Sequence, residues 1–167
     1  MRTQFEWFYP LSEQHQIQFK IDAPKELYWN TDSVYFKKIL ANLISNAFKY
    51  TEDGGTVRIS LHEEENFLVL KVYNTGKGIE EADMQNIFDR YRILGTMDND
   101  DNRQNTARNG LGLFICHSLV QSLGGKIDIE SEVGQYAEFT VTLPFGIVEE
   151  SSDDTIDEDI PVSLPSP

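Results

Sequence analysis

Three polar residues recur at helical spacing between Tyr35 and Thr51. Asn42, Asn46 and Lys49 stand at positions i, i+4 and i+7, so a helix stacks them along one face. Asparagine is a mediocre helix former, and two asparagines in register indicate amide oxygens that are directed at a ligand. A solvated polar face is the alternative, and it is the commoner explanation for a single asparagine. A ligand site therefore requires phosphate-binding or base-binding groups elsewhere in the chain.

Two glycine-bearing segments can supply such groups. Residues 74–79 (NTGKGI) follow a predicted strand, and their two glycines permit positive φ and the close approach of a ring to the backbone. Residues 110–113 (GLGL) open a predicted helix, whose first amides and dipole can bind an anion. Residues 95–109 are polar and lack periodicity, which is typical of a mobile functional loop. An ordinary turn and a surface insertion are the alternatives for the first segment and for the loop.

The segment that carries the asparagines has the pattern of an amphipathic helix. Its apolar residues recur every three or four positions and form one buried stripe: Phe36, Leu40, Leu43, Ile44 and Ala47. Asp32 is a good N-cap, because its carboxylate can accept hydrogen bonds from the first free amides. We therefore predict a helix that runs to about Tyr50.

The other elements alternate with turns. Period-two patterns and runs rich in β-branched residues predict strands at 16–21, 27–30, 56–62, 67–74, 126–130 and 136–143. Two further helices are predicted at 80–91 and 113–123. The expected architecture is five or six strands and three helices in one compact domain over residues 1–148.

Composition and charge narrow the classes of function. The chain has 167 residues, 40% of them hydrophobic, and a formal net charge of −14. Residues 149–160 hold seven acidic and no basic side chains, and with the Pro/Ser-rich end they predict a disordered tail or linker over 149–167. The remaining charge is still negative, so we expect no nucleic acid partner.

Targeting and metal signals are also informative. No apolar run approaches the roughly 20 residues of a membrane helix, and no basic segment precedes an apolar core. We expect a cytoplasmic protein, or the cytoplasmic part of something larger, without direct membrane contact. Cys116 is the only cysteine and lies in an apolar helical pattern, so we expect a small buried side chain. The histidines are scattered without metal-ligand spacing, which predicts no zinc site.

Four segments together resemble one family in order and spacing. Residues 42–51 (NLISNAFKYT) are similar to the N box of sensor histidine kinases, and residues 74–79 to their first glycine box. Residues 87–91 (IFDRY) resemble the F box, and residues 109–113 (NGLGL) the second glycine box. The resemblance covers about residues 16–144 and points to the catalytic, ATP-binding domain of these kinases, in the wider class of gyrase-type and MutL-type ATPases. The chain lacks G-x-x-x-x-G-K-[ST], which excludes a P-loop fold.

The resemblance implies an α/β (α+β) two-layer sandwich, in which a mixed, mostly antiparallel sheet packs on three helices, with a long ATP lid over residues 92–109. It also implies ATP and Mg²⁺ as ligands. Asn46 would be the magnesium ligand and Asn42 would support the same cluster, as suits a hard cation that takes oxygen donors. Lys49 would meet a phosphate, and Tyr50 would pack near the adenine or ribose.

The two glycine boxes and several arginines complete the implied site. Asn74 would receive the adenine amino group, and the ring would close in on Gly76, Gly78 and Ile79. Phosphate would be bound by amides of the second box, from Gly110, Leu111, Gly112 and Leu113. Four arginines are available to neutralise the γ-phosphate: Arg90, Arg92, Arg103 and Arg108. The family pattern does not fix which arginine does so, and the implied catalytic residues are Asn42, Lys49, Arg90 and Arg108.

Three positions depart from the family pattern. Asn74 replaces the usual aspartate, and its uncharged amide predicts weaker or more water-dependent base recognition. Arg108 and Asn109 replace a Gly-Thr pair, which stiffens the lid hinge and puts a cation beside the phosphate site. Arg92 follows Tyr91 where the family often has another aromatic residue, so the alignment of the F-box arginine stays open.

The resemblance implies a protein-histidine kinase that transfers the γ-phosphate of ATP to a histidine on a separate dimerisation domain of the same full-length protein. None of the three histidines in the chain is followed by the acidic residue and later proline of the family's acceptor helix. A response regulator would act downstream, and the whole protein would be a membrane-bound sensor. This piece would be monomeric, because dimerisation in the family belongs to the missing helices. Alone, it should bind ATP and turn it over little.

Three other functions are alternatives to this one. Gyrase-type ATPases carry a glutamate base one turn before the magnesium asparagine, whereas this chain has Asn42, and an amide cannot take a proton from water. An anti-sigma-type serine kinase is the second alternative, and residues 46–50 (NAFKY) and the long lid favour a histidine kinase over it. A degenerate nucleotide-binding or interaction module, motivated by Asn74 and the altered lid hinge, would bind ATP without phosphotransfer.

Overall fold

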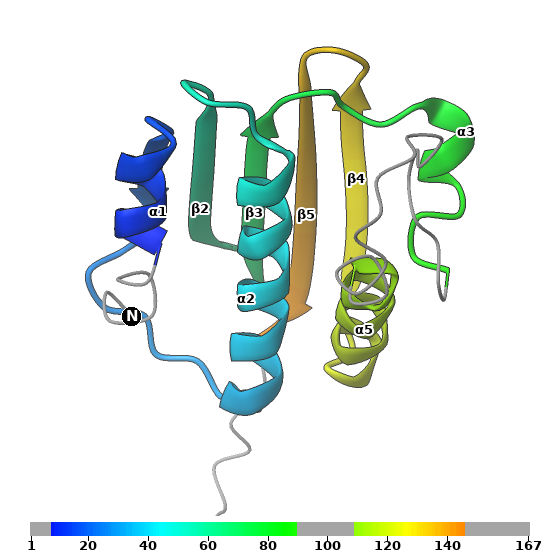
Figure 1. Ribbon diagram of the computed structural model, residues 1–167. Helices are drawn as coiled ribbons and strands as arrows, with labels where there is room; N and C mark the ends of the chain where they lie inside the picture. The colour runs from blue at the N-terminus through cyan, green and yellow to red at the C-terminus, as the bar shows by residue number, and fades with distance from the viewer. Residues whose placement is uncertain (1–7, 90–108, 146–167) are drawn as a thin grey trace, which may run out of the picture.

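The computed structural model describes residues 8–89 and 109–145 (Figure 1). The elements in chain order are α1 (Tyr9–Gln14), β1 (Gln18–Asp22), α2 (Ser33–Tyr50), β2 (Thr56–Glu64), β3 (Phe67–Thr75), α3 (Glu81–Met84), α5 (Asn109–Ser122), β4 (Lys126–Glu132) and β5 (Tyr136–Pro144). Several predicted features lie outside the described residues: the tail over 149–167, the lid before Asn109, and Arg90, Arg92, Arg103 and Arg108.

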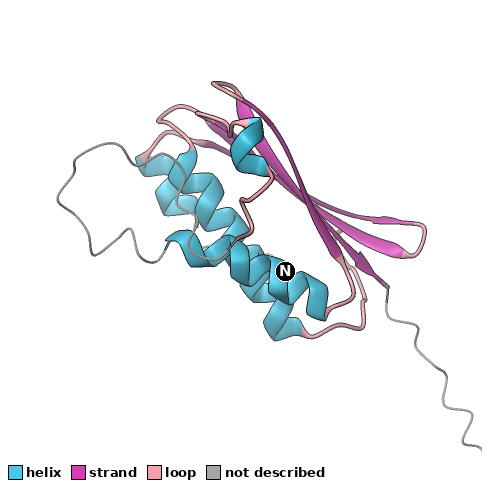
Figure 2. Ribbon diagram, turned by 90° about the vertical axis from the view of Figure 1, so that its right-hand side faces the viewer, coloured by secondary structure: helices cyan, strands magenta, loops and turns pink. Residues whose placement is uncertain are grey.

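The strands form one sheet in the order β1-β2-β3-β5-β4. β1 runs parallel to β2, whereas the other neighbours are antiparallel. In the middle of the sheet, Leu70 of β3 pairs with Leu61 of β2 and with Val141 of β5. Figure 2 shows the helices on one side of this sheet. The predicted two-layer sandwich with a mixed, mostly antiparallel sheet is confirmed.

α2 lies across the sheet because one stripe of the helix is apolar. Asp32 caps it as predicted, since its Oδ1 accepts hydrogen bonds from the amides of Val34 and Tyr35 at 2.8 and 3.0 Å. The buried residues of α2 are the five predicted ones with two more: Phe36, Ile39, Leu40, Leu43, Ile44, Ala47 and Phe48. α5 lies beside α2 and adds Cys116 and Val120 to the same core (Figure 1).

Residues 27–30 are irregular, although their alternating pattern predicts a strand. Trp29 contributes its side chain to packing, and its backbone joins no sheet. Its Nε1 donates a hydrogen bond to the carbonyl of Pro144 at 3.2 Å, and its ring lies edge-on to Phe36. The strand prediction was wrong here, because a period-two pattern does not distinguish a paired strand from a segment that buries alternate side chains.

Two helices differ from the sequence pattern. The helix predicted at 80–91 is helical only at Glu81–Met84 in its described part, and the chain then continues in turns that bury Ile87. α1 was not predicted; the ring of Phe8 before it stacks on Phe48 of α2 at 5.3 Å between centroids. Within residues 8–89 and 109–145, no helix has both the length and the apolar character needed to cross a membrane.

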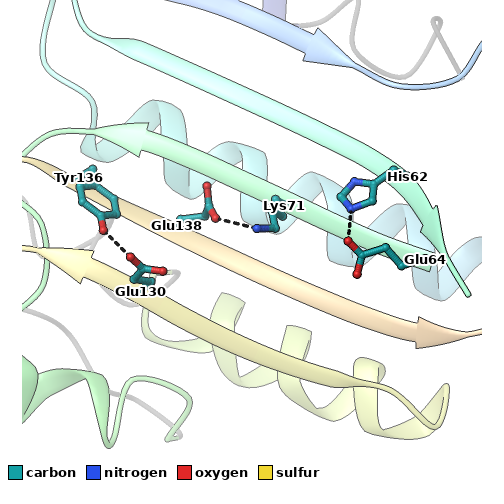
Figure 3. Close-up of polar contacts among 6 residues, drawn as sticks. All are labelled: His62, Glu64, Lys71, Glu130, Tyr136 and Glu138. Carbon is teal, nitrogen blue, oxygen red and sulfur yellow. Dashed lines mark hydrogen bonds and ion pairs between the residues drawn. The ribbon is translucent and has the colours of Figure 1, made fainter. Parts of the chain in front are cut away.

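The sheet face turned away from the helices carries polar pairs, drawn in Figure 3. Lys71 lies 3.4 Å from Glu138 across β3 and β5. The phenol of Tyr136 donates a hydrogen bond to Glu130 Oε1 at 2.7 Å, from β5 to β4. This bond and the surrounding carboxylates raise the pKa of Tyr136 to about 12 from its ordinary value of 10.0, because they favour the protonated phenol.

We predict that the Tyr136 phenol stabilises the fold in a pH-dependent way. Its pKa is about 12 in the folded chain and about 10 in the unfolded chain, so the contribution is complete below pH 10 and is lost as pH rises towards 12. Thermal unfolding should therefore show a steeper fall in Tm between pH 10 and 12 for the parent than for Tyr136→Phe. Parallel Tm curves for the two proteins over this range would contradict the prediction.

Candidate functional site

The predicted polar row on α2 is present. Asn42 and Asn46 are half-buried one turn apart, and Lys49 and Tyr50 are exposed at the end of the helix. The Lys49 ammonium lies 4.9 Å from the centroid of the Tyr50 ring and 3.4 Å from its hydroxyl. The row therefore offers two amide groups and, further along, a cation beside an aromatic ring.

Asn42 lies at the boundary between α2 and α5. α5 begins at Asn109 and not at the predicted Leu113, so Gly110 and Gly112 lie within the beginning of the helix. A Cβ on Gly112 would stand 3.5 Å from Asn42 Oδ1. The backbone of the second glycine box therefore lies next to the N-box helix.

Cys116 lies one turn further along α5, and its Sγ is 3.7 Å from the carbonyl of Ile39. Burial raises the pKa of this thiol to about 12, an effect that a hydrogen bond with Asn42 partly offsets. The thiolate is the reactive form, so we predict that iodoacetamide does not alkylate the folded chain near neutral pH. Mass spectrometry should detect the adduct only after urea unfolds the protein; rapid labelling without urea would contradict the burial of this side chain.

The segment Asn74–Ile79, here called the glycine loop, meets the end of α2. Gly76 has φ of +151°, and a Cβ on it would come within 2.2 Å of the Tyr50 carbonyl oxygen. Only a residue without a side chain can therefore approach α2 in this way. Asn74 is 5% exposed, and its amide nitrogen donates to the carbonyl of Thr75 at 3.1 Å. The first glycine box and the N box are thus in direct contact.

The end of β4, the turn at residues 133–135 and the first residue of β5 hold the glycine loop from the other side. These residues, 131–136, are called the β4–β5 turn below. Gly76 N donates to the carbonyl of Gln135 at 3.0 Å, and Gly134 N donates to that of Lys77 at 2.7 Å. Gly78, at φ of +64°, packs so closely on β4 that a Cβ would lie 2.2 Å from the Glu132 carbonyl oxygen. Figure 1 shows the end of α2, the end of β3 and this turn at the same edge of the molecule.

Contact between the β4–β5 turn and the glycine loop was not predicted from the sequence. One signal could have revealed it: Ile127 and Ile129 alternate inward along β4, and the next inward position is Ser131. A hydroxyl in register with core residues indicates a specific hydrogen bond. Thr51 was also not singled out, although it is buried at the end of α2 and its hydroxyl donates to the Ala47 carbonyl at 2.6 Å.

Residues 31–147 match the family of histidine kinase-, DNA gyrase B- and HSP90-like ATPases. The chain belongs to this family. The sensor protein SrrB of Staphylococcus aureus (strain NCTC 8325 / PS 47) is 36% identical to this ATPase domain over 120 residues, which are 72% of the chain and 20% of SrrB. The domain therefore spans about a fifth of the length of this curated relative.

Solved histidine kinases resemble the ATPase domain in structure. The nucleotide-free catalytic domain of the histidine kinase ThkA has a TM-score of 0.73 and 26% identity, over 86% of this chain and 89% of that one. Full-length ShkA, solved in complex with AMPPNP, has a TM-score of 0.72 and 25% identity, over 86% and 29% of the two chains. The predicted membership among sensor histidine kinase catalytic domains, and with it ATP as the nucleotide, is confirmed.

Proposed function

We propose that the domain binds Mg-ATP between α2, the glycine loop and the start of α5, and transfers the γ-phosphate to a histidine on a separate dimerisation domain of the same full-length protein. One observation carries this proposal: the face of α2 with Asn42 and Asn46 is flanked by Gly112 at one end and Gly76 at the other. The absence of a Cβ on Gly76 lets the glycine loop approach the end of this face, and Gly112 brings the start of α5 within van der Waals distance of Asn42.

The donor atoms on α2 fit magnesium. Among the described residues, no three His, Cys, Asp or Glu side chains converge on a metal site. The amide oxygen of Asn46, supported by Asn42, is a hard neutral donor, which suits an ion that keeps several waters and binds mainly through substrate phosphates. Magnesium would accordingly arrive with the nucleotide, and it would neutralise charge on the transferring phosphoryl group.

The remaining residues of the site would position the nucleotide. The Asn74 nitrogen is occupied by the Thr75 carbonyl, so its oxygen is the group that would accept the adenine amino proton. Ile79 would line the same base pocket, Tyr50 would pack against adenine or ribose, and Lys49 would meet a phosphate. The backbone amides from Gly110 to Leu113 would bind phosphate at the start of α5. We propose that the γ-phosphate is neutralised from among Arg90, Arg92, Arg103 and Arg108.

Asn42 favours transfer over hydrolysis. A hydrolase would need a base at this position to deprotonate water, and a neutral amide that contacts α5 cannot serve as one. The catalytic demand on the domain is then mostly positioning and charge neutralisation. We place the acceptor histidine in the part of the protein beyond this domain and a response regulator downstream, and we propose a cytoplasmic site of action for a monomeric domain.

Phosphotransfer can be tested directly. The chain would be mixed with Mg²⁺, γ-labelled ATP and the separately produced helical domain of the full-length protein. We expect label on the helical domain that is lost in acid and retained in alkali, as for phosphohistidine. Acid-stable label would indicate a serine kinase, and ATP binding without any transfer would indicate a nucleotide-binding interaction module.

A further inference from the structure

We propose that Ser131 is a positioning residue for the nucleotide base, because its hydroxyl fixes the glycine loop to the β4–β5 turn. The hydroxyl accepts a hydrogen bond from Ile79 N at 2.8 Å and donates one to the Tyr136 carbonyl at 2.6 Å. It thereby joins the last residue of the glycine loop to the first residue of β5. The inference rests on the proposed nucleotide site, of which the glycine loop forms the base-binding side.

Ser131 contributes a side chain to contacts between the glycine loop and the β4–β5 turn that otherwise include hydrogen bonds between backbone atoms. The bonds from Gly76 to Gln135 and from Gly134 to Lys77 join main-chain atoms, so substitution of a side chain does not remove them. The Ser131 hydroxyl holds the end of the loop at Ile79, and its loss leaves two partly buried backbone groups without this partner. The loop would then be held at its centre and released at its end.

The β4–β5 turn provides a fixed support for this bond. The Tyr136 ring stacks on Tyr73 of β3 with centroids 5.5 Å apart, and the Arg58 guanidinium lies 5.0 Å from the centroid of the Tyr73 ring. The Tyr136 phenol is also bonded to Glu130 (Figure 3). Side chains on the outer face of the sheet thus anchor the turn that positions the loop on the nucleotide side.

The consequence is geometric, because base recognition depends on a small number of well-placed atoms. Asn74, Gly76 and Ile79 belong to one short segment, and release of its end shifts the groups that would contact the adenine. Displacements of about 1 Å in such groups are enough to lower binding or rate substantially. Ser131 therefore acts on the base through the loop and does not touch the nucleotide itself.

The test is calorimetric titration of ADP and of GDP, both with Mg²⁺, into the parent, Ser131→Ala and Ser131→Thr. We expect Ser131→Ala to weaken ADP binding about tenfold and to reduce the preference for ADP over GDP, since the lost bond misplaces the base-binding atoms. Ser131→Thr keeps a hydroxyl and should restore both quantities. The matched control is Ser122→Ala, which removes a bond from a serine hydroxyl to the Ser118 carbonyl on α5 and should leave both unchanged.

Exchange of the Ile79 amide proton, followed by NMR without nucleotide, gives a second readout. It should be faster in Ser131→Ala than in the parent and close to the parental rate in Ser131→Thr. Equal ADP affinity and equal Ile79 exchange in the parent and Ser131→Ala would overturn the inference while leaving the proposed function intact. A parent that is folded but binds no ADP would overturn the proposed function and this inference with it. Equal losses of affinity in both Ser131 variants, with matching falls in Tm, would reduce Ser131 to a structural role.

Discussion

Replacement of Asn46 by alanine should remove the magnesium dependence of nucleotide binding. Asn46 is half-buried in the polar row of α2, one turn from Asn42, and its amide oxygen is the proposed metal ligand. Because no cluster of acidic or histidine side chains in the described ranges could take over the ion, the variant would retain only the contacts to the nucleotide. We expect ATP affinity in the presence of Mg²⁺ to fall at least about tenfold, the lower end of what loss of groups around a metal costs.

Calorimetry with and without Mg²⁺ on parent and variant measures this effect. Asn30→Ala is the matched control, because Asn30 is an exposed asparagine in the irregular segment before α2. This variant should bind ATP as the parent does. Asn46→Ala should match the parent when magnesium is withheld. If Asn46→Ala keeps the full increase in ATP affinity on addition of Mg²⁺, the metal ligand is another residue.

Gly76→Ala should disrupt the site and destabilise the fold. The new Cβ would come within 2.2 Å of the Tyr50 carbonyl oxygen, and the backbone has φ of +151°, which side-chain-bearing residues rarely adopt. The carbonyl belongs to the last residue of a long helix and cannot move freely. Conformational strain and overpacking together should lower the free energy of unfolding by about 2–4 kcal/mol. Nucleotide affinity should fall at least about tenfold, because the loop must leave α2.

Gly54→Ala separates the effect of conformational strain from that of overpacking. Gly54 also has positive φ, at +81°, but a Cβ there meets nothing within 4 Å. Gly54→Ala should therefore lower the free energy of unfolding only by the conformational strain, about 1–2 kcal/mol, and leave ADP binding unchanged. Urea unfolding and calorimetry on the two variants compare the positions directly. If Gly76→Ala were no more destabilising than Gly54→Ala, the close packing of the glycine loop on α2 would be refuted.

The sequence was most informative where a site residue and its support lie close together in the chain. Asp32, the apolar stripe of α2 and the row from Asn42 to Lys49 follow from local spacing, and the structure has all three. The glycine loop was predicted as a unit, but its contacts were not. Ser131 lies 52 residues after Ile79, and no periodicity reports which distant strand a loop will meet.

The errors have a similar cause. Residues 27–30 alternate like a strand, but Trp29 donates its hydrogen bond to the Pro144 carbonyl, 115 residues later in the chain. α5 begins at Asn109 because Gly110 and Gly112 are accommodated within a helix that packs on α2, whereas their intrinsic preference argues against a helical position. Tertiary packing decided both outcomes.

The position of β5 between β3 and β4 determines when this domain can become complete during synthesis. β1, β2 and β3 leave the ribosome first, and β3 then has one paired edge, against β2, and one open edge along the apolar run from Leu68 to Leu70. The strand that closes this edge is made last, after α5 and β4, and it also brings Gln135 to the glycine loop. Until then the nascent chain exposes an unpaired apolar strand, and the proposed base pocket is incomplete. Pairing of β5 would therefore both lower the risk of aggregation and complete the proposed nucleotide site.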